Sequence, residues 1–425
     1  MKTDRFISGL LGIDRPKLWY SNINWEQKSN IGVRLPQFQN ATTDSLMNQM
    51  HIHQIYLADS QDEVIVQESP EPEFLSYLEE RGIHIPKLLI GHPDEFAGRL
   101  KGTYTIPYLM DTQQSEFISS NGGLRIGPPP ELALKLNNKI YTRLFCEKNS
   151  IPVSDGIVCT RYDQLEEAFR KLQEMTYAER YVLKTAYGSS GKNLFHIRSR
   201  KEFDFILTYL SRQRHLEDFM VSIERWHEVE YNLNAQLLLW DGECHVLAVT
   251  EQDNNDVGVY RGSDLNPPIP KHVMEHYLQE LKWLGQLLLQ EGYEGFMGVD
   301  SMMDKQGRLI PVIEINARLT MVTYTLSIRK KLLADGFPHI CVQFFDVKSS
   351  RRKEFSVLRK QVEMITASDS GGSLIYGFHE VFEPKQQMYV YRIFMMFWEK
   401  DRHQLETMVQ RTEQIMNPKT LTEMR

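Results

Sequence analysis

Two stretches of the sequence combine residue types that could act on phosphate groups. The first, LKTAYGSSGKNLF (residues 183–195), places Lys184 in an apolar, strand-like run that is followed by a loop of Gly and Ser. Glycine lets backbone N–H groups approach phosphate oxygens closely, and a lysine can meet a phosphate as a point charge. An ordinary β-hairpin turn with solvated lysines has the same pattern, so this stretch alone leaves both interpretations open.

This loop differs from a P-loop in its spacing and in the type of element after it. A P-loop has the pattern G-x-x-x-x-G-K-[ST] and leads from a strand into a helix. Here only two serines separate Gly188 from Gly191, and the residues after Lys192 are strand-like. The sequence therefore predicts a loop between two antiparallel strands, which could fold over a bound anion as a flap.

The second stretch, GVDSMMDKQGRLIPVIEINARLT (residues 298–320), supplies carboxylates. We expect Asp300 on one strand, and Glu314 and Asn316 on its partner after the turn DKQGR. Residues i and i+2 share one face of a strand, so Arg318 continues the face of Glu314 and Asn316. In a paired register, Asp300 lies opposite them. Two carboxylates and an amide suit Mg²⁺, which prefers oxygen ligands and bridges nucleotide phosphates; the solvated polar face of an edge hairpin is the alternative.

The composition indicates ample core material and a slightly acidic balance. The 425 residues are 41% hydrophobic, and 49 Lys and Arg stand against 56 Asp and Glu, a net charge of −7. A general nucleic-acid binder would carry a basic field. We therefore expect no nucleic-acid partner.

Cysteine usage and the absence of a long apolar run favour a cytoplasmic location. The four cysteines are scattered and form no CxxC pair, which is typical of buried thiols in a reducing compartment. The N-terminal stretch MKTDRFISGLLGIDRP is too interrupted for a signal peptide, and no uninterrupted apolar run is long enough to span a bilayer. We expect no membrane partner.

Turn signals and periodicity divide the chain into three parts. Residues 1–130 alternate strand-like runs (HQIYLA, VIVQ, KLLIG) with helical ones and end in SSNGGLRIGPPPE, which predicts an α/β domain. Residues 131–330 contain both stretches described above. Residues 331–425 are mixed, with strands expected near ICVQFFDV and MYVYRIFMMF. His51 and His53 flank Ile52 on what looks like a strand, and we expect both histidines at the surface.

Two local patterns predict further elements. Apolar residues at Leu132, Leu136, Ile140 and Leu144 recur at helical spacing and predict one helix through all four positions. DGE (residues 241–243) separates two strand-like runs and predicts a tight hairpin turn.

Taken in order, these features resemble the ATP-grasp ligases. The resemblance rests on Lys139, on Lys184 with its GSSG flap, on IERW near residue 224 and on GVD…EINAR, and it covers roughly residues 130–325. The implied fold class is mixed α/β and α+β. It consists of an N-terminal α/β pre-ATP-grasp domain (1–130), a two-lobed ATP-grasp fold with the nucleotide and Mg²⁺ site (131–330) and a C-terminal α+β segment (331–425).

Carried over by position, the resemblance implies a role for each candidate residue. Arg318 and Lys184 are the expected catalytic residues, with Arg318 steadying the transferring phosphoryl group and the tetrahedral intermediate. The expected ATP-binding residues are Lys139, Lys184, Ser189, Ser190, Gly191, Glu224 and Glu230, with the two glutamates as candidates for the ribose or adenine edge. The expected Mg²⁺ ligands are Asp300, Glu314 and Asn316.

The resemblance also implies a reaction. Family members use ATP and Mg²⁺ to activate a carboxylate as an acyl phosphate and pass it to an amine or a thiol. The flanks SNGGLRIGPPPELALKLNNK and VYRGSDLNPP resemble a bacterial branch that includes pheganomycin-type peptide ligases and the butirosin glutamate–carrier-protein ligase. The implied function is transfer of an amino acid, L-glutamate as the specific expectation, to an acyl carrier protein or a peptide acceptor in antibiotic biosynthesis.

Other interpretations remain beside this one. Arg261 in the VYRGSDLNPP loop could grip a substrate carboxylate through a bidentate pair, or it is a surface arginine. The whole protein could be a nucleotide-binding regulatory or scaffolding protein with a degenerate site. A phosphotransferase that leaves phosphate on its product is a third option.

Overall fold

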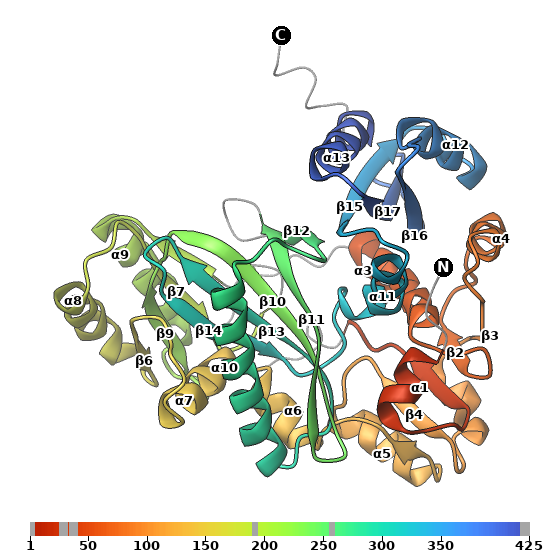
Figure 1. Ribbon diagram of the computed structural model, residues 1–425. Helices are drawn as coiled ribbons and strands as arrows, with labels where there is room; N and C mark the ends of the chain where they lie inside the picture. Colours follow the sequence, from red (N-terminus) through yellow and green to blue (C-terminus); the bar gives the residue numbers. More distant parts are fainter. Residues whose placement is uncertain (1–4, 25–32, 34–40, 189–193, 255–259, 417–425) are drawn as a thin grey trace.

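The described residues form three β-sheets and the helices that cover them (Figure 1). The computed structural model describes residues 5–24, 33, 41–188, 194–254 and 260–416. The first sheet is parallel with five strands, the second is antiparallel with four, and the third is antiparallel with eight. This combination of a parallel α/β part with antiparallel α+β parts confirms the predicted fold class.

The N-terminal parallel sheet has the strand order β3-β2-β1-β4-β5. Its strands are β1 (Lys17–Tyr20), β2 (Glu63–Val66), β3 (Lys87–Ile90), β4 (Tyr104–Pro107) and β5 (Leu124–Arg125). Parallel strands need crossover connections, and these carry most of the helices of this part. The helices are α1 (Phe6–Leu11), α3 (Ala41–Gln49), η1 (Met50–Tyr56), α4 (Pro72–Glu80), η2 (Pro93–Arg99) and α5 (Thr112–Ser120).

One of the three strand predictions for this part is wrong. VIVQ and KLLIG form β2 and β3, as predicted, but HQIYLA lies in the 3₁₀ helix η1 and the turn after it. His51 and His53 are 3% and 0% exposed, so their expected surface position is also wrong. A short apolar run can be strand or helix with equal ease, and tertiary packing buries both imidazoles here.

The small antiparallel sheet carries the Gly- and Ser-rich loop. Its order is β6-β9-β7-β8, and its strands are β6 (Gly156–Cys159), β7 (Tyr181–Thr185), β8 (Leu194–Ile197) and β9 (Val221–Arg225). The helices η3 (Tyr162–Gln164), α8 (Leu165–Met175), α9 (Arg200–Leu210) and η4 (Ser211–Gln213) accompany it, and apolar side chains of α8 and α9 pack on it. β7 and β8 pair antiparallel, as predicted. Residues 189–193 between them lie outside the described residues.

The large sheet has the order β14-β13-β10-β11-β12-β15-β17-β16. Its strands are β10 (Val229–Trp240), β11 (Glu243–Asn254), β12 (Tyr260–Asp264), β13 (Gly295–Asp304), β14 (Leu309–Asn316), β15 (His339–Ser349), β16 (Gly371–Glu383) and β17 (Met388–Glu399). Asp241 and Gly242 between β10 and β11 have φ of 51° and 76°, which suits the predicted two-residue hairpin turn. β12 pairs with β15, so this sheet continues across position 330, and a domain division there stays a prediction.

Helices α6 (Pro130–Leu136), α7 (Lys139–Lys148) and α10 (Lys271–Gln290) pack on one face of the large sheet. The prediction of a single helix through Leu144 is wrong, because Asn137 and Asn138 interrupt the helix. The Asn138 side chain accepts from the backbone N–H groups of Ile140 and Tyr141 and so caps a new helix. Lys139 is consequently the first residue of α7.

The C-terminal strands pack against the N-terminal part of the chain. One continuous hydrophobic cluster includes Tyr56, Val64, Tyr376 and Phe394, and Figure 1 shows β15, β16 and β17 above α3 and α11. The remaining helices are η5 (Thr323–Thr325), α11 (Leu326–Ala334), α12 (Phe355–Ile365) and α13 (Arg402–Met416). Within the described ranges, every helix is too short or too polar to cross a membrane.

Candidate active site

The predicted carboxylate pair forms on the hairpin of β13 and β14. Asp300 is the register partner of Glu314, and Gly298 is that of Asn316, as expected from the sequence. Asn316 donates from Nδ2 to Asp300 Oδ2 at 3.2 Å. The hairpin therefore brings both carboxylates and the amide together.

Amide side chains from neighbouring strands complete this cluster. Asn234 Nδ2 on β10 and Gln252 Nε2 on β11 donate to Asp300 Oδ1 at 2.7 Å and 2.8 Å. Sequence reasoning missed both residues. A signal existed in NLNAQ (residues 232–236), where polar residues recur with the period of two that marks one face of a strand.

This cluster carries an excess of negative charge. Burial, together with the neighbouring charge of Glu314, raises the pKa of Asp300 to about 6. Lys139 forms an ion pair with Glu314, which leaves one positive charge beside two carboxylates. Neighbouring carboxylates resist simultaneous ionisation unless a cation joins them, so the cluster favours a bound cation.

A second cluster, on the small sheet, has two cations around one buried carboxylate. Glu224 Oε2 on β9 pairs with Lys184 Nζ on β7 at 2.7 Å, and Glu224 Oε1 lies 3.4 Å from Arg143 Nη1. The Ser222 hydroxyl donates to the same Oε1 at 2.7 Å. Burial opposes ionisation of Glu224, but the charges of Lys184 and Arg143 outweigh it and lower its pKa to about 2. The sequence had pointed to Lys184 and Glu224 but not to Arg143.

Helix α7 connects the two clusters. Its first residue, Lys139, pairs with Glu314 on the large sheet, and Arg143 one turn later reaches Glu224 on the small sheet. The Lys139 backbone N–H also donates to Ala186 O, just after β7 (2.8 Å). The helix break at Asn138 thus places the two cations where each meets its own glutamate.

Arg318 lies at the junction with the N-terminal domain. Its guanidinium stands 5.3 Å from the centre of the Tyr108 ring, and Nη1 donates to Leu319 O at 3.2 Å. The Leu319 N–H donates to Tyr108 O at 3.0 Å. A small cavity is lined by both Arg318 and Tyr108, so this arginine faces the domain that precedes the two-lobed part.

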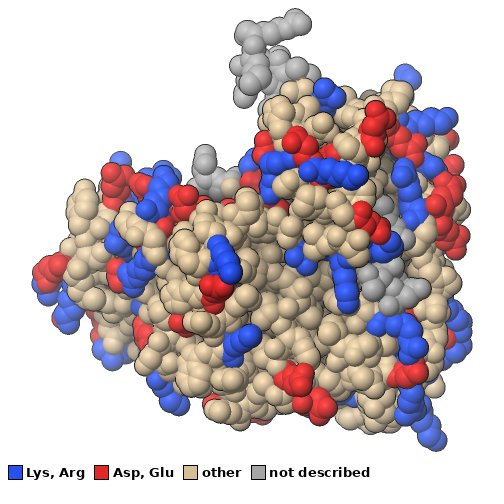
Figure 2. Space-filling model, viewed as in Figure 1, with Lys and Arg blue, Asp and Glu red and all other residues tan. Residues whose placement is uncertain are grey.

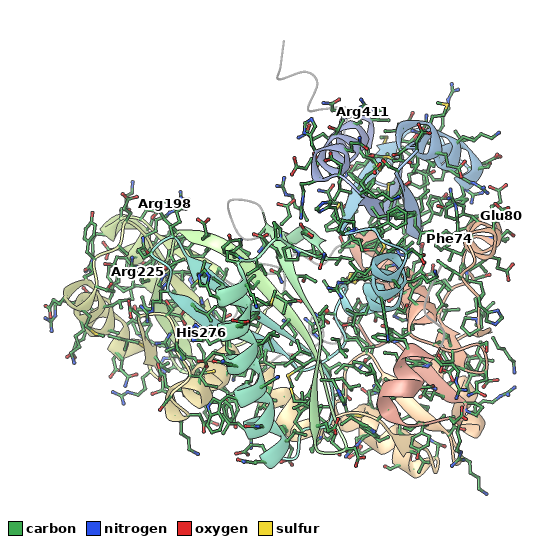
Figure 3. The ribbon with its side chains drawn as sticks, viewed as in Figure 1. Phe74, Glu80, Arg198, Arg225, His276 and Arg411 are labelled. Carbon is green, nitrogen blue, oxygen red and sulfur yellow. The ribbon has the colours of Figure 1, made fainter. Side chains whose placement is uncertain are left out.

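Two other candidates lie apart from the clusters. Glu230 is exposed and lines a pocket of ≈ 430 Å³ with His276 of α10, on the helix-covered side of the large sheet (Figure 3). Arg261 pairs with Asp253 at 3.0 Å, next in sequence to Gln252. Because neighbouring strand residues face opposite ways, Asp253 and its partner Arg261 point away from Asp300. Ser189, Ser190 and Gly191 lie outside the described residues.

A buried histidine network and a more exposed arginine–aspartate pair fix the joint between the two sheets. His227, between β9 and β10, approaches Asp304 Oδ2 through Nδ1 and the Ser154 hydroxyl through Nε2, both at 3.0 Å. Arg308 binds both carboxylate oxygens of Asp155 at 3.0 Å. The chain passes between the sheets at residues 153–156 and 225–229, and these contacts tie both passages to the β13–β14 turn. Figure 3 shows Arg225 at this end of the small sheet.

The cluster on β13 and β14 is not a site made of three or more acidic, His or Cys ligands. In the part of the chain that the structure describes, no such group is arranged to hold a metal ion. The candidate set is instead two carboxylates and an amide. Figure 2 shows Lys and Arg interspersed with Asp and Glu where charged residues gather on the displayed face.

Comparison with known proteins places this architecture in a family. A protein-family profile described as an ATP-grasp domain matches residues 136–322. The fold resembles the phosphoribosylamine–glycine ligase of Thermotoga maritima, with a TM-score of 0.57, 13% identity and coverage of 87% of this chain and 94% of that chain. It also resembles N5-carboxyaminoimidazole synthetase of Staphylococcus aureus, with a TM-score of 0.57, 12% identity and coverage of 88% and 96%.

A curated relative is more similar in sequence. The butirosin acyl-carrier protein–L-glutamate ligase of Niallia circulans is 34% identical over 313 residues, which cover 73% of this chain and 74% of that protein. The chain therefore belongs to the ATP-grasp family, as the order of its motifs had indicated.

Proposed function

We propose that the protein is an ATP-dependent ligase that activates an amino-acid carboxylate as an acyl phosphate and transfers it to an amine or to a carrier-protein thiol. The observation that carries this proposal is the pair of lysine–glutamate clusters, one with two carboxylates beside one cation and the other with two cations around one buried carboxylate. The negative cluster suits a metal ion, and the positive cluster suits phosphate oxygens. ATP with Mg²⁺ presents both charges in one ligand.

The donor set of the negative cluster fits Mg²⁺. Asp300 and Glu314 offer carboxylate oxygens, which this ion prefers, and Asn316 would offer its amide oxygen after the amide turns over. Mg²⁺ held by these residues would supply charge neutralisation for phosphoryl transfer. Lys139 would then be free to leave Glu314 for a phosphate oxygen.

The small sheet would hold the rest of the triphosphate. Lys184 is the proposed catalytic lysine, and the backbone of Ser189, Ser190 and Gly191 is proposed to cover the phosphates. Glu224 is fully engaged by Lys184 and Arg143, so its role in this proposal runs through Lys184. Contacts of Glu224 or Glu230 with the ribose or adenine stay predictions.

The acid would enter from the side of the N-terminal domain. Arg318 faces that domain through Tyr108, and a guanidinium there can stabilise negative charge that develops during acyl transfer. L-Glutamate as the acid and an acyl carrier protein as the acceptor are supported by the relative that is 34% identical. Arg261 is left out of this proposal because of its pairing with Asp253.

Phosphate release tests the proposal. The purified protein is given ATP and Mg²⁺ with L-glutamate or other single amino acids, with and without a pantetheinylated carrier protein. We expect release that requires both an acid and an acceptor, together with acylated carrier detected by mass spectrometry. Release without a carrier but with an amine acceptor would identify a peptide ligase instead.

Two variants separate the site from its surroundings. Glu314→Gln should abolish release, because it removes a carboxylate from the negative cluster. Glu243→Gln, an exposed carboxylate in the β10–β11 hairpin, should retain the wild-type rate. Wild-type protein that binds ATP but releases no phosphate with any pair of substrates would favour a regulatory protein, and product that keeps the phosphate would identify a phosphotransferase.

A further inference from the structure

Arg143 is a buried cation that contacts the same glutamate as Lys184, the proposed phosphate-binding lysine. Its side chain is 7% exposed and lies 3.4 Å from Glu224 Oε1. Nη2 donates to Gly156 O at 3.2 Å and pairs with Glu147, which is 40% exposed, at 2.9 Å. A buried charge is tolerated only when it is paired, so these contacts give Arg143 a fixed position beside Glu224.

The backbone leaves room for this pair at one glycine. Gly156 on β6 is the register partner of Glu224. A Cβ added at Gly156 would lie 2.7 Å from Glu224 Cγ and 3.2 Å from Arg143 Nη1. Any larger residue would push the carboxylate and the guanidinium from their positions. The small sheet therefore accommodates the Arg143–Glu224 contact at a position that admits glycine alone without displacement.

The two oxygens of Glu224 have different partners. Oε1 lies near Arg143 and accepts from Ser222, whereas Oε2 pairs with Lys184. Departure of Lys184 would therefore leave Oε1 with both of its partners. Breaking a buried ion pair is costly mainly because one charge remains unpaired, and Arg143 removes most of that cost.

We propose that Arg143 is a positioning residue that holds Glu224 as a fixed anion, so that Lys184 can exchange between Glu224 and the phosphate oxygens of a bound nucleotide. This inference rests on the proposed function. Before a nucleotide binds, Lys184 stays ordered on Glu224. When a triphosphate arrives, Lys184 turns to it, and Glu224 remains neutralised by Arg143 and hydrogen-bonded by Ser222.

The proposal predicts a particular coupling between Arg143 and Glu224. Without Arg143, Glu224 depends on Lys184 for its neutralisation, and a nucleotide must compete with that glutamate for the lysine. Removing Glu224 as well abolishes the competitor. The second substitution should therefore restore the ATP affinity that the first one lowers, whereas two substitutions that act on ATP binding independently would each add their own loss of affinity.

Nucleotide affinity measures this coupling directly. ATP is titrated into the wild-type protein and into Arg143→Met, Glu224→Gln and the double variant, with binding followed by calorimetry. We expect Arg143→Met to weaken ATP binding about tenfold, in the range of measured couplings between contacting charges, and the double variant to return to within about threefold of wild type. A double variant as weak as the product of the two single effects would overturn the proposal.

Matched controls and a second readout cover variants that fold poorly. Arg143→Lys, which keeps the charge, should restore affinity, and Arg170→Met, which removes an exposed arginine of α8, should leave it unchanged. Acylation of Lys184, followed by mass spectrometry without nucleotide, should be several-fold slower in Arg143→Met than in wild type. An unchanged labelling rate would contradict the proposal even if the double variant fails to fold.

The same titration separates this inference from the proposed function. If the wild-type protein binds ATP but the double variant does not regain ATP affinity, only the proposed role of Arg143 is contradicted. Wild-type protein that does not bind ATP would remove the ligase proposal, and the positioning role with it.

Discussion

The two clusters contain the same residue types but differ in the number of cations that lie beside each carboxylate. On the large sheet, Asp300 and Glu314 share one cation, Lys139. On the small sheet, the buried Glu224 is shared by two cations, Lys184 and Arg143, and Arg143 also pairs with the more exposed Glu147. The pKa values follow this difference, since that of Asp300 rises to about 6 and that of Glu224 falls to about 2.

Burial cannot explain this contrast, because it opposes ionisation of both carboxylates. The sign of the neighbouring charge decides the direction of each shift. One cluster gains by taking up a cation and the other by taking up an anion. A lysine–glutamate pair therefore does not by itself indicate which kind of ligand it favours. The third charged residue, Asp300 in one cluster and Arg143 in the other, determines that preference.

Among the cationic side chains, the largest effect on turnover is expected from Lys184 of the positive cluster. Lys184→Met should lower kcat/KM for ATP-dependent phosphate release by about 10²–10³, the loss typical of a charge-stabilising contact to the transition state. Lys171→Met, an exposed lysine of α8, is the matched control. Steady-state kinetics at varied ATP would decide, and a loss below threefold would contradict the assigned role.

Neutralising one carboxylate in each cluster should have opposite effects on stability. Glu224→Gln should lower the free energy of unfolding by about 3 kcal/mol, because two buried cations lose their anion. Asp300→Asn should raise it by about 1 kcal/mol in EDTA, because like charges no longer face each other, and activity should nevertheless be lost. Urea unfolding measures both, with Asp335→Asn, an exposed carboxylate just after α11, as control. Changes of the same sign would show that the two clusters do not differ in their charge balance.

The joint between the two sheets fixes the position of one cluster relative to the other. His227→Leu should cost about 2 kcal/mol of unfolding free energy, because Asp304 and Ser154 lose a buried partner. His227→Asn, which retains a donor for Asp304, should cost less. His276→Leu alters an exposed histidine of α10 and should stay within about 0.5 kcal/mol of wild type. An equal cost at both histidines would show that the network does not hold the joint.

A third buried pair, His53 with His379, carries no net charge. Their Nε2 atoms are 3.2 Å apart, and burial lowers the pKa of His53 to about 3 and that of His379 well below its usual value. Below pH 6.5 these two histidines bind protons in the unfolded chain but stay neutral in the native state. The free energy of unfolding therefore falls as pH falls.

The expected slope is about 1.4 kcal/mol per pH unit for His53 between pH 6.5 and pH 3, and His379 makes the dependence steeper in the same direction. His53→Gln should therefore make the dependence shallower by about 1 kcal/mol per pH unit. Urea unfolding at pH 7, 6 and 5 measures this slope. An unchanged slope would mean that the pair is already charged in the folded protein.

Local patterns were sufficient for the parts of the site that lie within one hairpin. The period of two in EIN and the turn DKQGR predicted the pairing of Asp300 with Glu314, and the Gly- and Ser-rich run predicted the β7–β8 connection. Both features depend on neighbours in sequence, and strand geometry fixes them.

Long-range packing supplied what the sequence patterns did not. The apolar spacing of α6 and α7 continued through Asn138, and only the cap geometry showed that the helix restarts at Lys139. The pairing of β12 with β15 and the 3₁₀ conformation of η1 depend on segments far apart in sequence. β16 escaped notice because Gly377 interrupts its pattern at a bulge in its pairing with β17, where a Cβ would lie 2.5 Å from His53 Nε2.

Arg143 shows the same limit at the site itself. Its spacing of four residues from Lys139 places both on neighbouring turns of one helix, which the sequence contains. That Lys139 reaches the large sheet while Arg143 reaches the small one depends on where α7 lies between them. No periodicity encodes that placement, so the second cation of the positive cluster became visible only in the structure.

The proposed division of roles gives the metal to the negative cluster and phosphate to the positive cluster. The most direct test of this division is to measure the ATP dissociation constants of wild type, Glu314→Gln and Lys184→Met, each with Mg²⁺ and with EDTA. We expect Glu314→Gln to lose the strengthening by Mg²⁺ but to keep the metal-free affinity, and Lys184→Met to bind weakly under both conditions. Equal losses for both variants, with or without Mg²⁺, would show that the two clusters do not divide the ligand in this way.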